Sequence, residues 1–282
     1  MNELEYIVNE KNRDMLASML SEERAKKYKW FLRAISSLKY FPNSRIRGEF
    51  VEAFYLAMRI VDDVVDGDIP LPEGFASKKD FVQHCLNYAS NLSSPVFPID
   101  YLILNSFQKA DKAGYIIEEE TSLILSSMLF DAKRFGKYEI FSEKDLTEHF
   151  HRLDVEETIK GSLHIFGEPG SKFTYLKKLG TASRIYYNLR DFGDDYNTSG
   201  FINIPREAIK KHNVDINLLP SLDHKPLRNW FVDESVKGLD LISQHKKELS
   251  SANFPLHMKF VLYALYEQSA TRYFMNTLHK LR

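Results

Sequence analysis

The chain of 282 residues carries 38 Lys and Arg against 39 Asp and Glu, for a net charge of −1, and 44% of its residues are hydrophobic. That hydrophobic fraction excludes a disordered chain, and the balanced charge argues against a nucleic-acid-binding protein. A single cysteine, Cys85, excludes an intrachain disulfide and a thiolate zinc site.

Apolar residues recur at helical spacing in four long segments, which cover residues 45–66, 118–135, 175–192 and 256–281. Glycine and proline fall between such segments, and the alternating pattern of strands is nearly absent. The breaks between segments are too short to be domain linkers. We therefore predict one all-α domain over residues 1–282.

The first 14 residues are polar and charged, unlike a secretory signal peptide. Nowhere does the sequence approach the roughly 20 consecutive apolar residues that cross a bilayer. We expect a cytoplasmic protein and leave open a peripheral contact with a membrane.

The end of the first long segment is rich in acidic residues. Asp62 and Asp66 are four positions apart and so lie on one helix face, with Asp63 beside them and Arg59 three residues earlier. Carboxylates crowded among valines repel one another unless cations compensate their charge. Mg²⁺ does so well, since it binds a few carboxylates and completes its coordination with water and substrate phosphate.

A second acidic motif ends the third segment. Asp191 and Asp195 again lie four positions apart, with Asp194 next to them and Arg190 directly before. Arginine can clamp phosphate groups with two parallel hydrogen bonds. One such motif alone is as readily a solvated helix face, but two with the same arrangement favour a two-sided site for metal and diphosphate.

The two motifs, at residues 54–66 and 179–195, resemble the aspartate-rich motifs of the squalene/phytoene synthase family, and the stretch 200–205 follows at the family's spacing. The resemblance implies an all-α isoprenoid-synthase bundle with a central cavity and a prenyl diphosphate substrate. It also implies three Mg²⁺ ions bound with the diphosphate. The implied metal ligands are Asp62, Asp63, Asp66, Asp191, Asp194 and Asp195.

Other roles follow from the same resemblance. Arg59 and Arg190 would meet phosphate or hold the carboxylates in place, and Tyr55 and Tyr263 would bond phosphate or face a carbocation. The chain also departs from the family at several positions. Two departures come shortly before Arg190 and Asp191 of the second motif, where the family has Gln and Asn on the metal-facing side and this chain has Arg184 and Tyr187, with Asn188 one residue out of register.

Further departures lie after the second motif and upstream of the first. The family's Arg and Tyr after the second motif are replaced by Phe201 and Asn203. Upstream of the first motif, Ser36 or Ser37 stands in for a diphosphate-contacting signature.

The middle of the chain departs from the family most. His149, Leu153 and Glu157 share one helix face where the family has small apolar residues against the prenyl tail. If this face points inward, we expect a buried Glu157 to be paired, protonated or functional, with His149 as its natural partner. Shifts of register by one or two residues would instead turn Asp154 or Glu156 inward, or expose most of the acids.

Family precedent favours head-to-head joining of two prenyl diphosphates through a cyclopropyl diphosphate. A terpene cyclase, or a prenyltransferase that joins one prenyl diphosphate to another acceptor, would use the same ionisation. A non-catalytic assembly factor is the third hypothesis, against which the retained aspartates argue.

Overall fold

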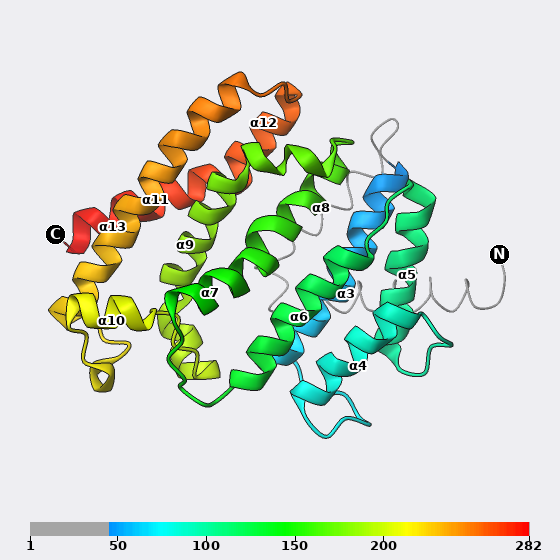
Figure 1. Cartoon of the computed structure of the whole chain (residues 1–282), viewed down its shortest axis with the longest axis horizontal. Coiled ribbons are helices and arrows are strands. Elements are labelled where there is room, and N and C mark those ends of the chain that lie inside the picture. Colours follow the sequence, from blue (N-terminus) through cyan, green and yellow to red (C-terminus); the bar gives the residue numbers. More distant parts are fainter. Residues whose placement is uncertain (1–44, 282) are drawn as a thin grey trace. The chain divides into compact units, whose positions relative to one another are not determined.

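The computed structural model describes residues 45–281, apart from the side chains of residues 153, 154, 162, 165, 257 and 265. These residues are helical almost throughout (Figure 1). Within them no strand forms, and one isolated bridge joins Ile140 to Ile202. The predicted all-α fold is therefore confirmed.

The described part of the chain divides into two compact units, each considered by itself. The first comprises residues 45–133 and 164–168, and the second comprises residues 134–163 and 169–281. A single domain over residues 1–282 stays a prediction.

The first unit is built around α3 (Arg45–Asp66), which packs along α5 (Pro98–Ala113) and touches α4 (Lys78–Asn91). The first 16 residues of α6 (Glu118–Arg134) complete the unit. Its core consists of buried apolar side chains that recur at helical spacing, so that each helix buries one face. On α3 these include Leu56, Ala57, Val61, Val64 and Val65.

Helix α3 ends where the sequence predicts, because Gly67 adopts the left-handed conformation at φ 86°. Glycine adopts this conformation without the penalty of a side chain, and it commonly ends helices. The backbone N–H of Asp68 donates to the carbonyl of Asp63 across the turn at 2.8 Å. This ending leaves the acidic residues in the last turn of the helix.

The second unit is built around α9 (Lys177–Asp194), which packs against α11 (Lys225–Ser251), η2 (His151–Glu156) and α13 (Gln268–Leu281). Phe192 of α9 packs against Trp230 and Phe231 of α11, with ring centroids 5.6 and 5.5 Å apart. The remaining helices of this unit are α7 (Glu143–Phe150), α8 (Glu157–Ile165) as far as residue 163, η3 (Gly170–Tyr175), η4 (Asp195–Ser199), α10 (Arg206–His212), η5 (Ile216–Leu218), α12 (Leu256–Leu262) and η6 (Tyr263–Glu267).

The four predicted helical segments correspond to α3, α6, α9 and the run from α12 to α13. The last segment also contains a π-helical turn, η6, which the apolar periodicity did not predict. A second π-helical turn, η2, separates α7 from α8. Among the described helices, none is long and apolar enough to cross a membrane.

The packing of α11 on α13 depends on Gly238. A Cβ atom at this position would lie 2.4 Å from the ring of Phe274, which is fully buried and has no room to move. We expect Gly238→Ala to lower the free energy of unfolding by about 1–3 kcal/mol, the usual cost of overpacking.

Denaturation by urea measures this loss, and Gly161→Ala is the matched control. Gly161 lies in α8, and a Cβ atom there would meet nothing within 4 Å among the described residues. In the control we expect unchanged stability or a gain of up to about 1 kcal/mol, because alanine favours helix. Equal stability of the two variants would contradict the close approach at Gly238.

Candidate functional site

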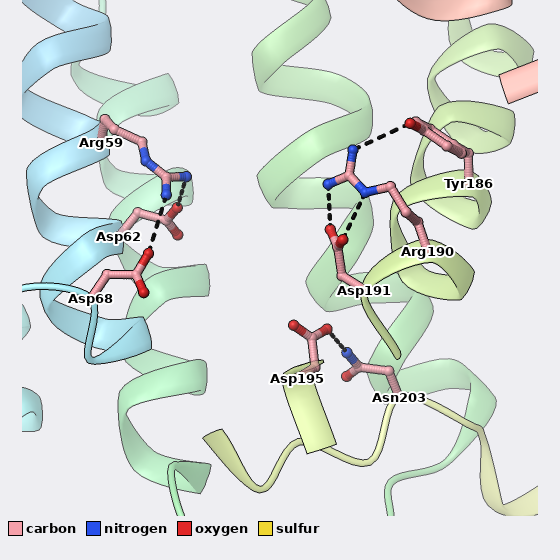
Figure 2. Close-up of polar contacts among 8 residues, drawn as sticks. All are labelled: Arg59, Asp62, Asp68, Tyr186, Arg190, Asp191, Asp195 and Asn203. Atoms are coloured by element: carbon pink, nitrogen blue, oxygen red, sulfur yellow. Dashed lines mark hydrogen bonds and ion pairs between the residues drawn. The ribbon is translucent and has the colours of Figure 1, made fainter. Parts of the chain in front are cut away.

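The first acidic motif lies at the C-terminal end of α3, and its arginine is engaged with its aspartates (Figure 2). Arg59 Nη1 lies 2.7 Å from Asp62 Oδ2, and Arg59 Nη2 lies 2.5 Å from Asp63 Oδ1. Asp68, in the turn after the helix, adds a carboxylate oxygen 3.9 Å from Arg59. The guanidinium of Arg59 therefore supplies positive charge that the crowded carboxylates need.

Asp66 has a basic neighbour from the next helix. Lys78, at the start of α4, donates from Nζ to the carbonyl of Val65 at 2.9 Å. Partial burial lowers the pKa of Lys78, and the charge of Asp66 partly offsets that effect. Tyr55 lies one turn before Arg59 on α3 and is half-buried. These contacts surround the last turn of α3, whose carbonyl groups also favour bound cations.

The second acidic motif ends α9, and Arg190 grips Asp191 through both carboxylate oxygens (Figure 2). Arg190 Nε donates to Asp191 Oδ1 at 2.7 Å, and Arg190 Nη1 donates to the hydroxyl of Tyr186 at 3.3 Å. The guanidinium also lies 4.7 Å from the ring centroid of Tyr187. Burial alone would lower the pKa of Arg190, but the hydrogen bonds to Asp191 and Tyr186 raise it above its ordinary value.

Asp195 has a different partner from Asp191. The side-chain amide of Asn203 donates from Nδ2 to Asp195 Oδ2 at 2.9 Å (Figure 2). Asn203 is in turn bonded through Oδ1 to Arg134 Nη1 at 2.9 Å. Asp194, the last residue of α9, is exposed.

Asn188, which the sequence places one residue out of the family's register, belongs to the same network. Its Nδ2 donates to the backbone carbonyl of Asn203 at 3.1 Å. Its Oδ1 is buried and has no hydrogen-bond partner among the described residues. Asn188 thus keeps a buried oxygen atom on α9, the helix that carries Asp191 and ends directly before Asp195.

The predicted residues outside the two acidic motifs lie in three environments. Arg184 places its guanidinium 3.8 Å from the ring centroid of Phe150, an intimate cation–π contact. Tyr263 begins η6, and 47% of its surface is exposed. Ser36 and Ser37 lie outside the described residues.

In the middle of the chain, Glu157 is buried and its neighbour Glu156 is half-exposed. His149 and Glu157 are both buried within the second unit, as the inward-facing register predicts. His149 packs on Phe150, with ring centroids 4.9 Å apart. Lys160 Nζ lies 3.3 Å from Glu157 Oε1 and 2.9 Å from Glu156 Oε1. The same lysine therefore forms ion pairs with a buried carboxylate and with a half-exposed one.

The donor atoms at both motifs suit Mg²⁺, which prefers hard oxygen ligands and keeps several waters. Asp62, Asp63 and Asp66 offer such oxygens at one helix end, and Asp191, Asp195 and Asn188 offer them at the other. Among the described residues, no group of three or more His, Cys, Asp and Glu side chains is gathered as a metal site. The pairs of carboxylates at each helix end fit an ion that completes its coordination with phosphate.

The sequence pattern did not predict the contacts of Lys78, Asp68 and Tyr186 with the two motifs, or the connection through Asn203. Asp68 follows the first motif closely, and its position after a helix-ending glycine was a usable signal. Tyr186 is four residues before Arg190, a spacing that brings side chains together on a helix. Lys78 and Asn203 reach their partners through turns whose course the sequence pattern does not reveal.

The fold is similar to those of two solved structures. No protein-family model and no curated protein matches the chain. The crystal structure of squalene synthase HpnC from Alicyclobacillus acidocaldarius is similar, with a TM-score of 0.69 and 14% identity over 98% of this chain and 96% of that chain. A dehydrosqualene synthase crystallised with a ligand has a TM-score of 0.57 and 16% identity over 99% of this chain and 86% of that chain. The chain thus has the all-helical fold of squalene and dehydrosqualene synthases, as the resemblance of its two aspartate-rich motifs predicts.

Proposed function

We propose that this chain is a Mg²⁺-dependent enzyme that ionises allylic prenyl diphosphates and joins two of them head to head. The observation that carries the proposal is the pairing of arginine with aspartates at the ends of α3 and α9, in a fold shared with squalene synthase. Each of these helix ends combines carboxylates for a metal with a guanidinium for a diphosphate.

The aspartates Asp62, Asp63, Asp66, Asp191 and Asp195 would hold the metal ions, with Asp194 at the exposed edge. Bound Mg²⁺ supplies positive charge that stabilises the departing diphosphate. Arg59 and Arg190 are each oriented by a carboxylate partner and would each bind diphosphate oxygens. Tyr55 and Tyr187, each within a turn of one of these arginines, are proposed to help orient the substrate.

The proposed reaction begins with heterolysis of the bond between C1 and oxygen in the first substrate. The electron pair leaves with the diphosphate, and C1 becomes part of an allylic cation. The π electrons of the C2=C3 bond in the second substrate then form a bond to this C1. Loss of one proton from the same C1, with released diphosphate as the available base, supplies the electrons that close a cyclopropane ring. The second substrate keeps its diphosphate.

Release of pyrophosphate from geranyl, farnesyl and geranylgeranyl diphosphate tests this function directly. We expect release with Mg²⁺, none with EDTA, and an organic product whose mass corresponds to two prenyl chains. A product built from one chain would favour a cyclase or a transfer to another acceptor. An absence of release from all three substrates would reject the proposed activity and favour the assembly-factor hypothesis.

The buried His149 and Glu157 favour a second candidate function, in which one prenyl diphosphate is cyclised or transferred to a polar acceptor. A carboxylate and an imidazole on a buried helix face can act as acid and base. They suit a polar acceptor better than a second aliphatic tail. We also propose a peripheral contact with a membrane, since prenyl chains partition into lipid.

Replacing Glu157 distinguishes the two candidates. If Glu157 meets the substrate, we expect Glu157→Val to change the product distribution or the preferred chain length. Mass spectrometry of the products measures the change. Glu156→Val is the matched control, because Glu156 shares Lys160 with Glu157 but is half-exposed. Products and rates unchanged in Glu157→Val would remove this residue from the site.

A further inference from the structure

We propose that Asn203 is a positioning residue that orients Asp195 for Mg²⁺ and takes its own orientation from the buried Arg134. This inference rests on the proposed function, because it assigns Asp195 to a metal. It concerns a relay of three side chains within the second unit, in which each contact is direct (Figure 2 shows the bond from Asn203 to Asp195).

Arg134 is the fixed end of the relay. It is the last residue of α6, and only 4% of its surface is exposed. Its guanidinium lies 4.1 Å from the ring centroid of Phe201 and 6.0 Å from that of Phe141. A guanidinium that lies over aromatic rings in this way is held more firmly than a lysine ammonium would be. The donor that Arg134 presents to Asn203 is therefore held in place.

Asn203 is almost fully buried, with 2% of its surface exposed, and its amide has one possible orientation. Arginine only donates hydrogen bonds, so the oxygen of the amide must face Arg134. The NH₂ group must then face Asp195, at 2.9 Å. The backbone carbonyl of Asn203 is held as well, by Asn188 of α9 at 3.1 Å.

The backbone between Asp195 and Asn203 folds back on itself to make this contact. The π-helical turn η4 ends at Gly200, which has a φ of 68° and whose added Cβ would lie 3.1 Å from Gly136 Cα. The N–H of Phe201 then donates to the carbonyl of Asp195 at 3.1 Å. Asn203 therefore returns to the helix end from which the chain has just departed.

The hydrogen-bond donor that Asn203 offers to Asp195 differs in charge from the donor that Arg190 offers to Asp191. Arg190 covers both oxygens of Asp191 with a full positive charge, whereas Asn203 holds Asp195 with a neutral amide. A neutral donor fixes the direction of a carboxylate without neutralising it. Outer partners that orient a metal ligand in this way commonly change metal affinity by 10- to 100-fold when they are replaced. We therefore assign Asn203 the role of such an outer partner, which sets the direction of the Asp195 carboxylate.

The test is a Mg²⁺ titration of the full chain in the presence of inorganic pyrophosphate. Binding is measured by thermal shift and, well below the melting temperature, by calorimetry. In Asn203→Ala we expect the half-saturating Mg²⁺ concentration to rise about 10- to 100-fold. Asn217→Ala is the matched control, because Asn217 donates from its amide to Asp215 at 3.0 Å in the exposed η5 region. The control should titrate as the wild type does.

Arg134→Lys provides a second variant should Asn203→Ala fail to fold. It retains the buried charge but loses the guanidinium over the ring of Phe201, and we expect the half-saturating Mg²⁺ concentration to rise in this variant too. A folded Asn203→Ala or Arg134→Lys with the wild-type Mg²⁺ titration overturns the positioning role, since a purely structural role would change melting and not metal affinity.

The same titration separates this inference from the proposed function. A wild-type chain that binds Mg²⁺ with pyrophosphate but releases none from prenyl diphosphates would reject the activity alone. The comparison of Asn203→Ala with Asn217→Ala would still decide the role of Asn203. A wild-type chain that binds no Mg²⁺ with pyrophosphate would overturn both.

Discussion

Mg²⁺-dependent release of pyrophosphate is expected to fall at least about a hundredfold when either Asp62 or Asp191 is replaced by alanine. Loss of one fixed group that stabilises charge in the transition state typically lowers turnover by two to three orders of magnitude. Both carboxylates lie in the last turn of a helix and contact an arginine, so each replacement removes a metal ligand and frees a guanidinium.

The expected losses are not additive. If both aspartates act in the same ionisation step, the double variant Asp62→Ala/Asp191→Ala should be about as inactive as either single variant, as for residues that act as a unit. Release of pyrophosphate under single-turnover conditions measures all three.

Asp233→Ala is a suitable control for these variants. Asp233 lies on the surface of α11, in an ion pair with Lys211 at 3.0 Å, and its side chain is 51% exposed. Exposed pairs of this kind contribute little to stability, so we expect wild-type activity. Retained activity in Asp191→Ala, together with a wild-type thermal shift by Mg²⁺ and pyrophosphate, would contradict the assignment of the second motif to the metal.

Arg190→Gln is expected to change two binding equilibria in opposite directions. Arg190 contacts both oxygens of Asp191, so a Mg²⁺ ion that binds Asp191 without diphosphate competes with the guanidinium. Removing this competitor should raise the affinity for Mg²⁺ alone by about two- to fivefold, the equivalent of a partly exposed ion pair.

The loss of activity in the same variant should be much larger. A diphosphate gives Arg190 a new anionic partner, and glutamine cannot replace its two parallel hydrogen bonds. We therefore expect turnover to fall by about 100-fold, since the charge that develops on the leaving group loses a fixed donor. Calorimetric titration with Mg²⁺, with and without pyrophosphate, measures the affinities, and release of pyrophosphate measures turnover.

Arg152→Gln is the matched control for the arginine. Arg152 pairs with Glu148 one turn earlier on the helix, and both side chains are close to half-exposed. This variant should have wild-type affinities and turnover. If Arg190→Gln weakened the binding of Mg²⁺ alone, Arg190 would be a support for Asp191 and not its competitor, and the exchange of partners would be wrong.

The acidic helix ends were predictable because their geometry is local. A spacing of four residues brings Asp62 and Asp66 to one face whatever the rest of the chain does. The position of Arg59, three residues before Asp62, likewise fixes their contact. Gly67 after the helix explains why α3 ends where the apolar pattern stops.

The π-helical turns were not predictable in the same way. A π turn differs from an α turn by one residue, so the apolar spacing of η2 and η6 still fits an ordinary helix. The burial of Glu157 depends on where such a turn falls, because a shift of one residue would have brought a neighbouring acid inward. Packing of η2 against α9 decides this register.

The all-helical fold, the boundaries of α3 and the grouping of carboxylates with arginines at two helix ends could all be predicted from the amino-acid sequence. Each of these follows from contacts within one or two helical turns. The hydrogen bond from Asn203 to Asp195, and the bond to Asn203 from Arg134, 69 positions earlier in the chain, depend instead on long-range packing. Those contacts arise because Gly200 turns the backbone against Gly136, a long-range approach that helical periodicity does not encode.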